Sequence, residues 1–173
     1  QRLSRGLGDV YKRQTVGGTS LIGNSIGEKN EKNASYYFTH IIIYGLLISV
    51  FITFIGLYFS EKVFDLMGST QEITNLGLQY TNIMFYGSFL FFLVVSLNSL
   101  LHAEGDTKTY RNVLILSFLL NIILNPILIF GFLFIPAMGM MGIGLSTIIA
   151  QLIAFLIILF KVFKPSSCFL YTF

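Results

Sequence analysis

The sequence predicts an all-α polytopic membrane protein. Its 173 residues are 54% hydrophobic and only 11% charged, with a mean hydropathy of +0.76, whereas soluble domains carry about 25% charged residues. Between Arg111 and Lys161 there are 49 consecutive residues without Asp, Glu, Lys, Arg or His. A bilayer core of roughly 30 Å takes about 20 helical residues. This run is therefore long enough for two crossings.

Uncharged segments mark the crossings in order along the chain. Residues 15–26 are too few to span a bilayer and predict a partial crossing. The next crossing is Ile41 to Phe59, 19 residues bounded by His40 and Glu61. The following segment, Glu61–Met67, predicts a short amphipathic helix at the outer interface. A longer apolar stretch then predicts a crossing at about residues 80–101.

The 49-residue run divides where a proline and several glycines would reverse the chain, at Pro136, Gly139, Gly142 and Gly144. The last two predicted crossings are therefore residues 113–135 and 141–160. Gly27 and Gly105 each follow a predicted helix, and both are expected to end it in a left-handed C-cap.

The basic residues indicate how the chain is oriented. The predicted loops Gly27–His40 and His102–Asn112 and the segment after Phe160 share one face, and they contain Lys29, Lys32, Lys108, Arg111, Lys161 and Lys164. The opposite face has only Lys62. The positive-inside rule places the first set in the cytoplasm. We expect a multi-pass protein of the cell (inner or plasma) membrane, of bacterial type.

The two ends do not fit this pattern. Residues 1–14 (QRLSRGLGDVYKRQ) are basic, lack helical periodicity, and resemble translated adapter or vector sequence. Residues 165–173 form an uncertain tail. We therefore expect residues 15–163 to be an internal part of a longer transporter and assign no fold to the ends.

Several function classes find no support in the residues. A lone Cys168 excludes an internal disulfide and a cysteine-built metal site, and His40 and His102 stand singly in loop-like sequence. The lysines and arginines form no stripe that would bind nucleic acid. No nucleophile–base pair or phosphate-binding glycine loop is present. We therefore expect no enzyme activity, no cofactor and no resident metal.

A polar group lies deep within the first crossing of the long run. Ser117, Asn121 and Asn125 recur every four residues and share one helix face. Pro126 lacks an N–H, so it predicts a kink and frees the carbonyl of Ile122. The group is a candidate cation or substrate site. The alternative is that both amides bond to neighbouring helices, typically at about 0.6 kcal/mol each.

The last crossing has two recognisable faces. Small residues recur every fourth position at Gly142, Ser146, Ala150 and Ala154, a pattern that lets another helix approach closely. Beside this stripe, Thr147 and Gln151 form a polar pair. They are expected either to line the same cavity as the two asparagines or to bond across helices.

Four sequence motifs, in order, resemble the multidrug and toxic compound extrusion (MATE) family. They are GGTSLI with IGEKN at residues 17–30, LNSLLHAEGDTK at 97–108, NIILNPILIFG at 121–131 and MMGIGLST at 140–147. The resemblance implies part of helix 2 and helices 3–6 of one six-helix lobe. A complete transporter of this kind has two lobes, lies in the lipid bilayer, and exports cationic or amphipathic drugs in exchange for Na⁺ or H⁺.

The resemblance also implies a cation site. Asn121, Asn125 and Thr147 fall at matching positions, although many members have Asp where this chain has Asn125. The acidic residue that the family supplies from helix 1 is not in this sequence. We therefore expect these residues alone not to transport, and to require a second lobe. Two alternatives remain: a lipid-linked oligosaccharide or lipid flippase of the same wider group, and a small non-transporting membrane scaffold.

Overall fold

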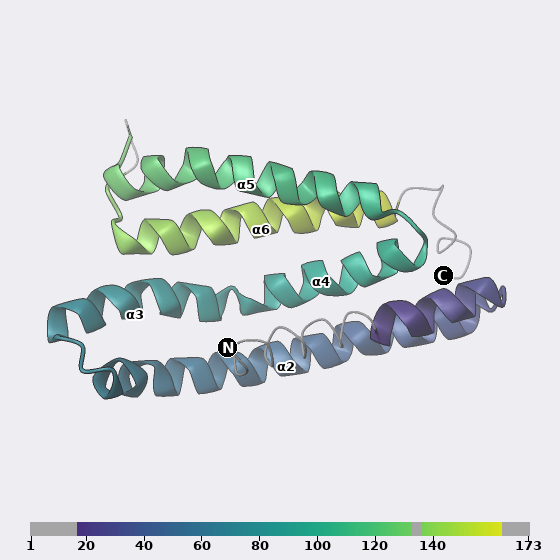
Figure 1. The fold of residues 1–173 in the computed structure, drawn as a ribbon, viewed down its shortest axis with the longest axis horizontal. Helices are drawn as coiled ribbons and strands as arrows, with labels where there is room; N and C mark the ends of the chain where they lie inside the picture. Colours follow the sequence, from purple (N-terminus) through teal and green to yellow (C-terminus); the bar gives the residue numbers. More distant parts are fainter. Residues whose placement is uncertain (1–16, 133–135, 164–173) are drawn as a thin grey trace.

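The computed structural model describes residues 17–132 and 136–163 and is all-helical (Figure 1). Residues 17–27 are helical. The elements that follow are α2 (Glu31–Leu66), α3 (Gln71–Tyr86), α4 (Ser88–Ala103), α5 (Thr107–Phe130) and α6 (Met140–Val162). The predicted leader 1–14, the tail 165–173 and residues 133–135 of one predicted crossing lie outside the described residues.

In Figure 1, α5 packs against α6, and the opposite side of α6 packs against α3 and α4. The helix α2 packs against both α3 and α4 on their other side. In the described chain, α2, α5 and α6 are long and apolar enough to span a membrane. The pair α3 and α4 would make a fourth span, bent by 44°.

Most helices extend beyond the predicted crossings, most of all α2, whereas α5, predicted as the crossing 113–135, begins earlier and ends earlier, at Phe130. The helix α2 has 36 residues because polar ends continue the apolar run Ile41 to Phe59 in both directions. At its start, Asn30 caps the helix by accepting a hydrogen bond from the N–H of Asn33 at 3.2 Å. The separate interfacial helix predicted at Glu61–Met67 is wrong, since α2 continues to Leu66. His40 and His102 are likewise helical and not in loops.

The crossing predicted at 80–101 is two helices joined at Gly87. The hydroxyl of Thr53 on α2 donates to the carbonyl of Phe85 at 2.8 Å and lies 2.8 Å from the hydroxyl of Ser88. These bonds satisfy polar groups at the bend. A side chain on Gly87 would collide with Ile148 of α6, whose nearest carbon lies 1.9 Å from the added Cβ position. The bend is therefore fixed by its neighbours on two sides.

The predicted glycine caps have different outcomes. Gly105 has a φ of 83°, so the prediction is confirmed there. At the first loop the left-handed residue is Lys29, with a φ of 55°, while Gly27 is still helical. The prediction for Gly27 was therefore wrong.

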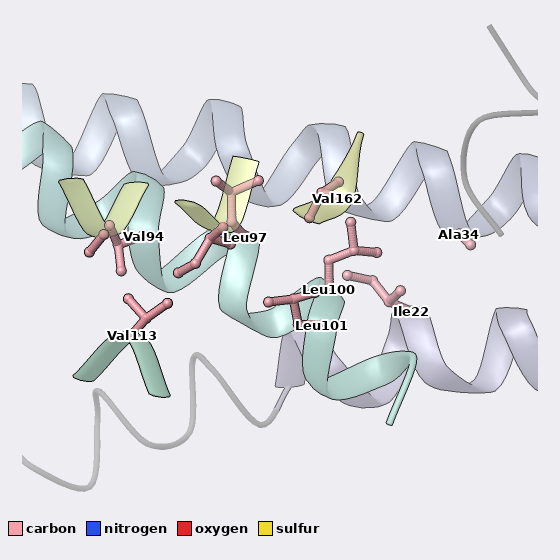
Figure 2. Close-up of a cluster of buried hydrophobic side chains, with 10 residues drawn as sticks. Ile22, Ala34, Val94, Leu97, Leu100, Leu101, Val113 and Val162 are labelled. Carbon is pink, nitrogen blue, oxygen red and sulfur yellow. The ribbon is translucent and has the colours of Figure 1, made fainter. Parts of the chain in front are cut away.

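The chain alternates between two ends, as the basic residues predicted. The turns at residues 28–30 and 104–106 and the end of α6 share one end, and the turn at 67–70 and the start of α6 share the other (Figure 1). A buried apolar cluster joins the first helical residues to α2, α4, α5 and α6 near the basic end (Figure 2). Its members are Ile22, Ala34, Val94, Leu97, Leu100, Leu101, Val113, Ala154, Ile158 and Val162.

Candidate functional site

The predicted polar stripe lies along the side of α5 that meets α6. Ser117, Asn121 and Asn125 are all half-buried. The side-chain N–H of Asn121 donates to the carbonyl of Ser117 at 3.0 Å. Its oxygen, Oδ1, is buried and has no hydrogen-bond partner within the described part of the chain. Burying such an oxygen without a partner is costly, so it is a point where a ligand can bind.

The second amide is paired across the helix interface. Asn125 is hydrogen-bonded to the hydroxyl of Ser146, a fully buried residue of α6. That hydroxyl also lies 2.8 Å from the carbonyl of Ile143. A hydroxyl has one proton, so it cannot donate to both oxygens at once. If the amide of Asn125 is turned so that its NH₂ faces Ser146, both bonds are satisfied and Oδ1 of Asn125 is released.

Close backbone packing sets this pairing. A Cβ added to Gly142 would lie 2.6 Å from the carbonyl oxygen of Leu128 on α5. The N–H of Met138 donates to that same oxygen at 2.9 Å. Every member of the predicted small-residue stripe is buried: Gly142, Ser146, Ala150 and Ala154. The prediction that this face packs against another backbone is confirmed.

The remaining predicted residues stay close to their own helices. The hydroxyl of Thr147 donates to the carbonyl of Ile143 at 3.0 Å, and Gln151 is half-buried one turn further along α6. Pro126 lies inside α5, which continues to Phe130, so this proline does not end the helix. The structure thus brings Asn125 to α6, but it joins neither Thr147 nor Gln151 to the amides by a hydrogen bond in the described chain.

Two residues of interest were missed at the sequence level. Ser146 was assigned only to the packing stripe, although a hydroxyl beside Thr147 was available as a signal. Asn98 on α4 is 5% exposed, and its Oδ1 has no partner among the described residues. A lone asparagine in an apolar helix gives no sequence signal of whether its amide is paired.

An apolar cavity of about 440 Å³ lies elsewhere, between the second half of α2 and α3. Its lining includes Phe51, Ile55, Phe59, Phe64 and Phe85. None of the predicted site residues lines it. The cavity and the polar stripe are therefore separate features.

The basic end contains a cluster that links α4, α5 and α6. Asp106 caps α5, accepting bonds from the N–H of Thr109 at 3.0 Å and from its hydroxyl at 2.6 Å. These bonds lower the pKa of Asp106, chiefly through the hydroxyl of Thr109. Lys161 of α6 lies 3.7 Å from the same carboxylate. Burial raises the pKa of Glu104, and the charge of Asp106 raises it further.

With this geometry in place, comparison with known proteins decides the family. Residues 15–127, more than half of the chain, match the family model described as MatE. The chain belongs to the MatE family. This is the multidrug and toxic compound extrusion family predicted from the four motifs, whose members are transporters and not enzymes. The chain is accordingly a multi-pass protein of the plasma membrane.

Individual MatE relatives agree with this assignment. The probable multidrug resistance protein YoeA of Bacillus subtilis is 31% identical over 143 residues, which are 83% of this chain and 31% of that protein. An FAD transporter of Shewanella oneidensis is 26% identical over 80% of this chain and 31% of its own length. The chain therefore spans about a third of the curated relatives it matches.

Solved MatE structures show the same fold. The inward-facing conformation of a multidrug resistance MATE family transporter superposes with a TM-score of 0.83 and 27% identity. The match covers 91% of this chain and 35% of that structure. The predicted fold class, a helical polytopic membrane protein of MATE type, is confirmed.

Proposed function

We propose that this chain forms part of one lobe of a secondary-active antiporter, which exports drugs or organic cations in exchange for Na⁺ or H⁺. A second lobe would complete the transporter, since the chain covers only about a third of its relatives. Transport would proceed by one lobe moving against the other around a central site. The coupling cation would bind at the polar stripe of α5.

The unpaired oxygen of Asn121 is the observation that supports this proposal. It is buried in an apolar helix, where an unsatisfied acceptor costs several kcal/mol unless something binds it. Asn125 lies one turn away on the same face, and the hydroxyl oxygen of Thr147 retains lone pairs after donating to its own helix. When the amide of Asn125 is turned so that its NH₂ faces Ser146, its Oδ1 is released, and these groups together offer three neutral oxygens to a cation.

Neutral oxygens favour Na⁺ over H⁺ as the ion held by these residues. Amides and hydroxyls do not titrate in the physiological range, so they cannot carry a coupling proton. Proton coupling would need a carboxylate from a segment outside this sequence. Ser117, one turn before Asn121 on α5, and Gln151, one turn after Thr147 on α6, would hold water or substrate.

The alternative of a lipid-linked oligosaccharide flippase fits less well. Such a substrate carries a pyrophosphate, which requires cations inside the membrane. From residue 112 to residue 160 this chain has no charged residue at all. The relative named as an FAD transporter suggests a third substrate class, a flavin nucleotide. The same objection applies to it, because these helices contain no cation to bind its phosphates.

The variant Asn125→Asp in the intact protein tests the proposed site. A carboxylate there adds a charge to the stripe, so we expect tighter cation binding and efflux that depends on pH. Efflux of a cationic dye from proteoliposomes, under imposed Na⁺ or H⁺ gradients, measures both effects. Asn112→Asp is the matched control, because Asn112 is an exposed residue of the same helix. Unchanged cation affinity and pH dependence in Asn125→Asp would refute the site.

A further inference from the structure

One face of α2 carries three neighbouring rings, tilted against one another by 40° and 45°. Tyr36, His40 and Tyr44 are four residues apart and therefore lie on one side of the helix. The ring centroids of Tyr36 and His40 are 4.0 Å apart, and those of His40 and Tyr44 are 6.3 Å apart. Tyr36 and Tyr44 are 59% and 60% exposed. We call this surface the aromatic ladder.

The aromatic ladder lies at one boundary of the apolar part of α2. The run from Ile41 to Phe59 is 19 residues, about 28 Å at 1.5 Å per residue, which matches a bilayer core of roughly 30 Å. His40 therefore marks the membrane boundary. Tyr36 lies about 6 Å outside it and Tyr44 about 6 Å inside. Helical side chains lean toward the helix N-terminus, so Tyr44 leans back toward the boundary.

A lysine precedes the aromatic ladder on the same face. Lys32 is exposed and lies one turn before Tyr36. Glu31 lies about 100° round the helix from Lys32, and Glu28 precedes the helix. At the other end of α2 the arrangement differs, since the ammonium of Lys62 lies 4.7 Å from the ring centroid of Tyr58 and 5.6 Å from that of Phe59. The cation there is engaged by rings of its own helix.

His40 has a defined hydrogen-bonding state. Its Nδ1 lies 2.8 Å from the carbonyl oxygen of Tyr36. A carbonyl only accepts, so Nδ1 carries the proton of this bond. The other nitrogen, Nε2, can then accept a hydrogen bond from a hydroxyl. A polar group of a bound molecule can therefore be held at the boundary.

We propose that the aromatic ladder and Lys32 bind the headgroup of an anionic phospholipid in the cytoplasmic leaflet, with phosphatidylglycerol as the type case. Lys32 attracts the phosphate, because a basic residue near an anionic leaflet contributes about a fivefold preference, or about 1 kcal/mol. His40 and the tyrosine hydroxyls bond the glycerol and phosphate oxygens, and the rings pack along the glycerol backbone. The site depends on membrane orientation and not on the proposed export function.

Native mass spectrometry of the intact protein, released from mixed micelles of equal phosphatidylglycerol and phosphatidylcholine, tests this site. We expect the unmodified protein to retain phosphatidylglycerol preferentially. Lys32→Gln should lower that preference about fivefold. The double variant Tyr36→Phe/His40→Phe keeps the rings but removes their polar groups, so it should lower the preference further without loss of the fold.

The matched control is Tyr58→Phe/Lys62→Gln, which makes similar changes at the other end of α2. It should keep the preference for phosphatidylglycerol. The proposal is overturned if the unmodified protein retains both lipids equally, if the double variant binds like the unmodified protein, or if the control loses the preference to the same extent. A thermal melt of each variant shows whether it is folded. If the double variant is unfolded, Lys32→Gln still tests the proposal, because it changes only an exposed residue.

Discussion

Replacing Gly142 by alanine should separate α5 from α6. The added Cβ would lie 2.6 Å from the carbonyl oxygen of Leu128, 2.7 Å from its carbonyl carbon and 3.1 Å from the nitrogen of Ile129. These are backbone atoms, so no side chain can turn aside. Reaching an ordinary contact of 3.4 Å requires a shift of about 0.8 Å, the difference between 3.4 and 2.6 Å. Overpacking of this kind costs about 1–3 kcal/mol.

The matched control is Gly45→Ala on α2. Gly45 is also buried in a helix, but its added Cβ would lie 3.4 Å from the hydroxyl of Ser96 and 3.8 Å from Phe92, both side-chain atoms. Alanine should therefore be tolerated there, and its better helix propensity, up to about 1 kcal/mol, favours it. The difference between the two variants isolates the steric cost.

The free energy of unfolding in the intact protein, titrated from mild detergent into sodium dodecyl sulfate, measures this difference. We expect Gly142→Ala to be the less stable variant by about 1–3 kcal/mol. Equal stability of Gly142→Ala and Gly45→Ala would show that α5 and α6 are not in backbone contact at Gly142. The close approach that brings Ser146 to Asn125 would then be wrong as well.

Two further predictions concern the basic end of the bundle. Asp106→Ala should cost about 1 kcal/mol of unfolding free energy at neutral pH through loss of the α5 cap. Because the pKa of Asp106 is lowered in the folded protein, this stabilisation is complete above the ordinary pKa of an aspartate and disappears as the pH falls through the lowered pKa. The unfolding free energies of the unmodified protein and of Asp106→Ala should therefore converge in acid. Glu104→Gln should stabilise the protein at neutral pH, where burial penalises the ionised carboxylate, and should have no effect below the ordinary pKa of a glutamate; a destabilised Glu104→Gln at neutral pH would contradict the burial of this side chain.

The membrane helices were the most predictable part of the fold. The uncharged run gave crossings at 113–135 and 141–160, and the helices are Thr107–Phe130 and Met140–Val162. In lipid every backbone polar group must be bonded within the protein, so a long uncharged run has few alternatives to a helix. Of the residues predicted to form the turn between them, Pro136 and Gly139 do lie outside the helices, but Gly142 and Gly144 lie inside α6, so that part of the prediction was wrong.

The extent of α2 and the bend at Gly87 were not predictable from hydropathy. The length of an apolar run indicates how much of a helix lies in the membrane, but not where the helix begins and ends. The polar residues at the two ends of α2 were therefore assigned to a loop and to a separate helix. A usable signal was the absence of glycine and proline between Phe59 and Leu66, with Gly68 at a φ of 72° just beyond. At Gly87, the contacts with Thr53 and Ile148 are tertiary and leave no trace in the local sequence.

The polar stripe shows why a sequence motif cannot by itself separate packing from binding. Asn125 and Asn121 look alike, yet one amide is paired and the other oxygen is not. The helix register accounts for the difference. Leu128 lies against Gly142 and Asn125 against Ser146, so the antiparallel pair places Asn121 at the level of Ala150, whose side chain has no polar atom. Because alanine follows serine one turn along α6, the same interface binds one amide and leaves the other available.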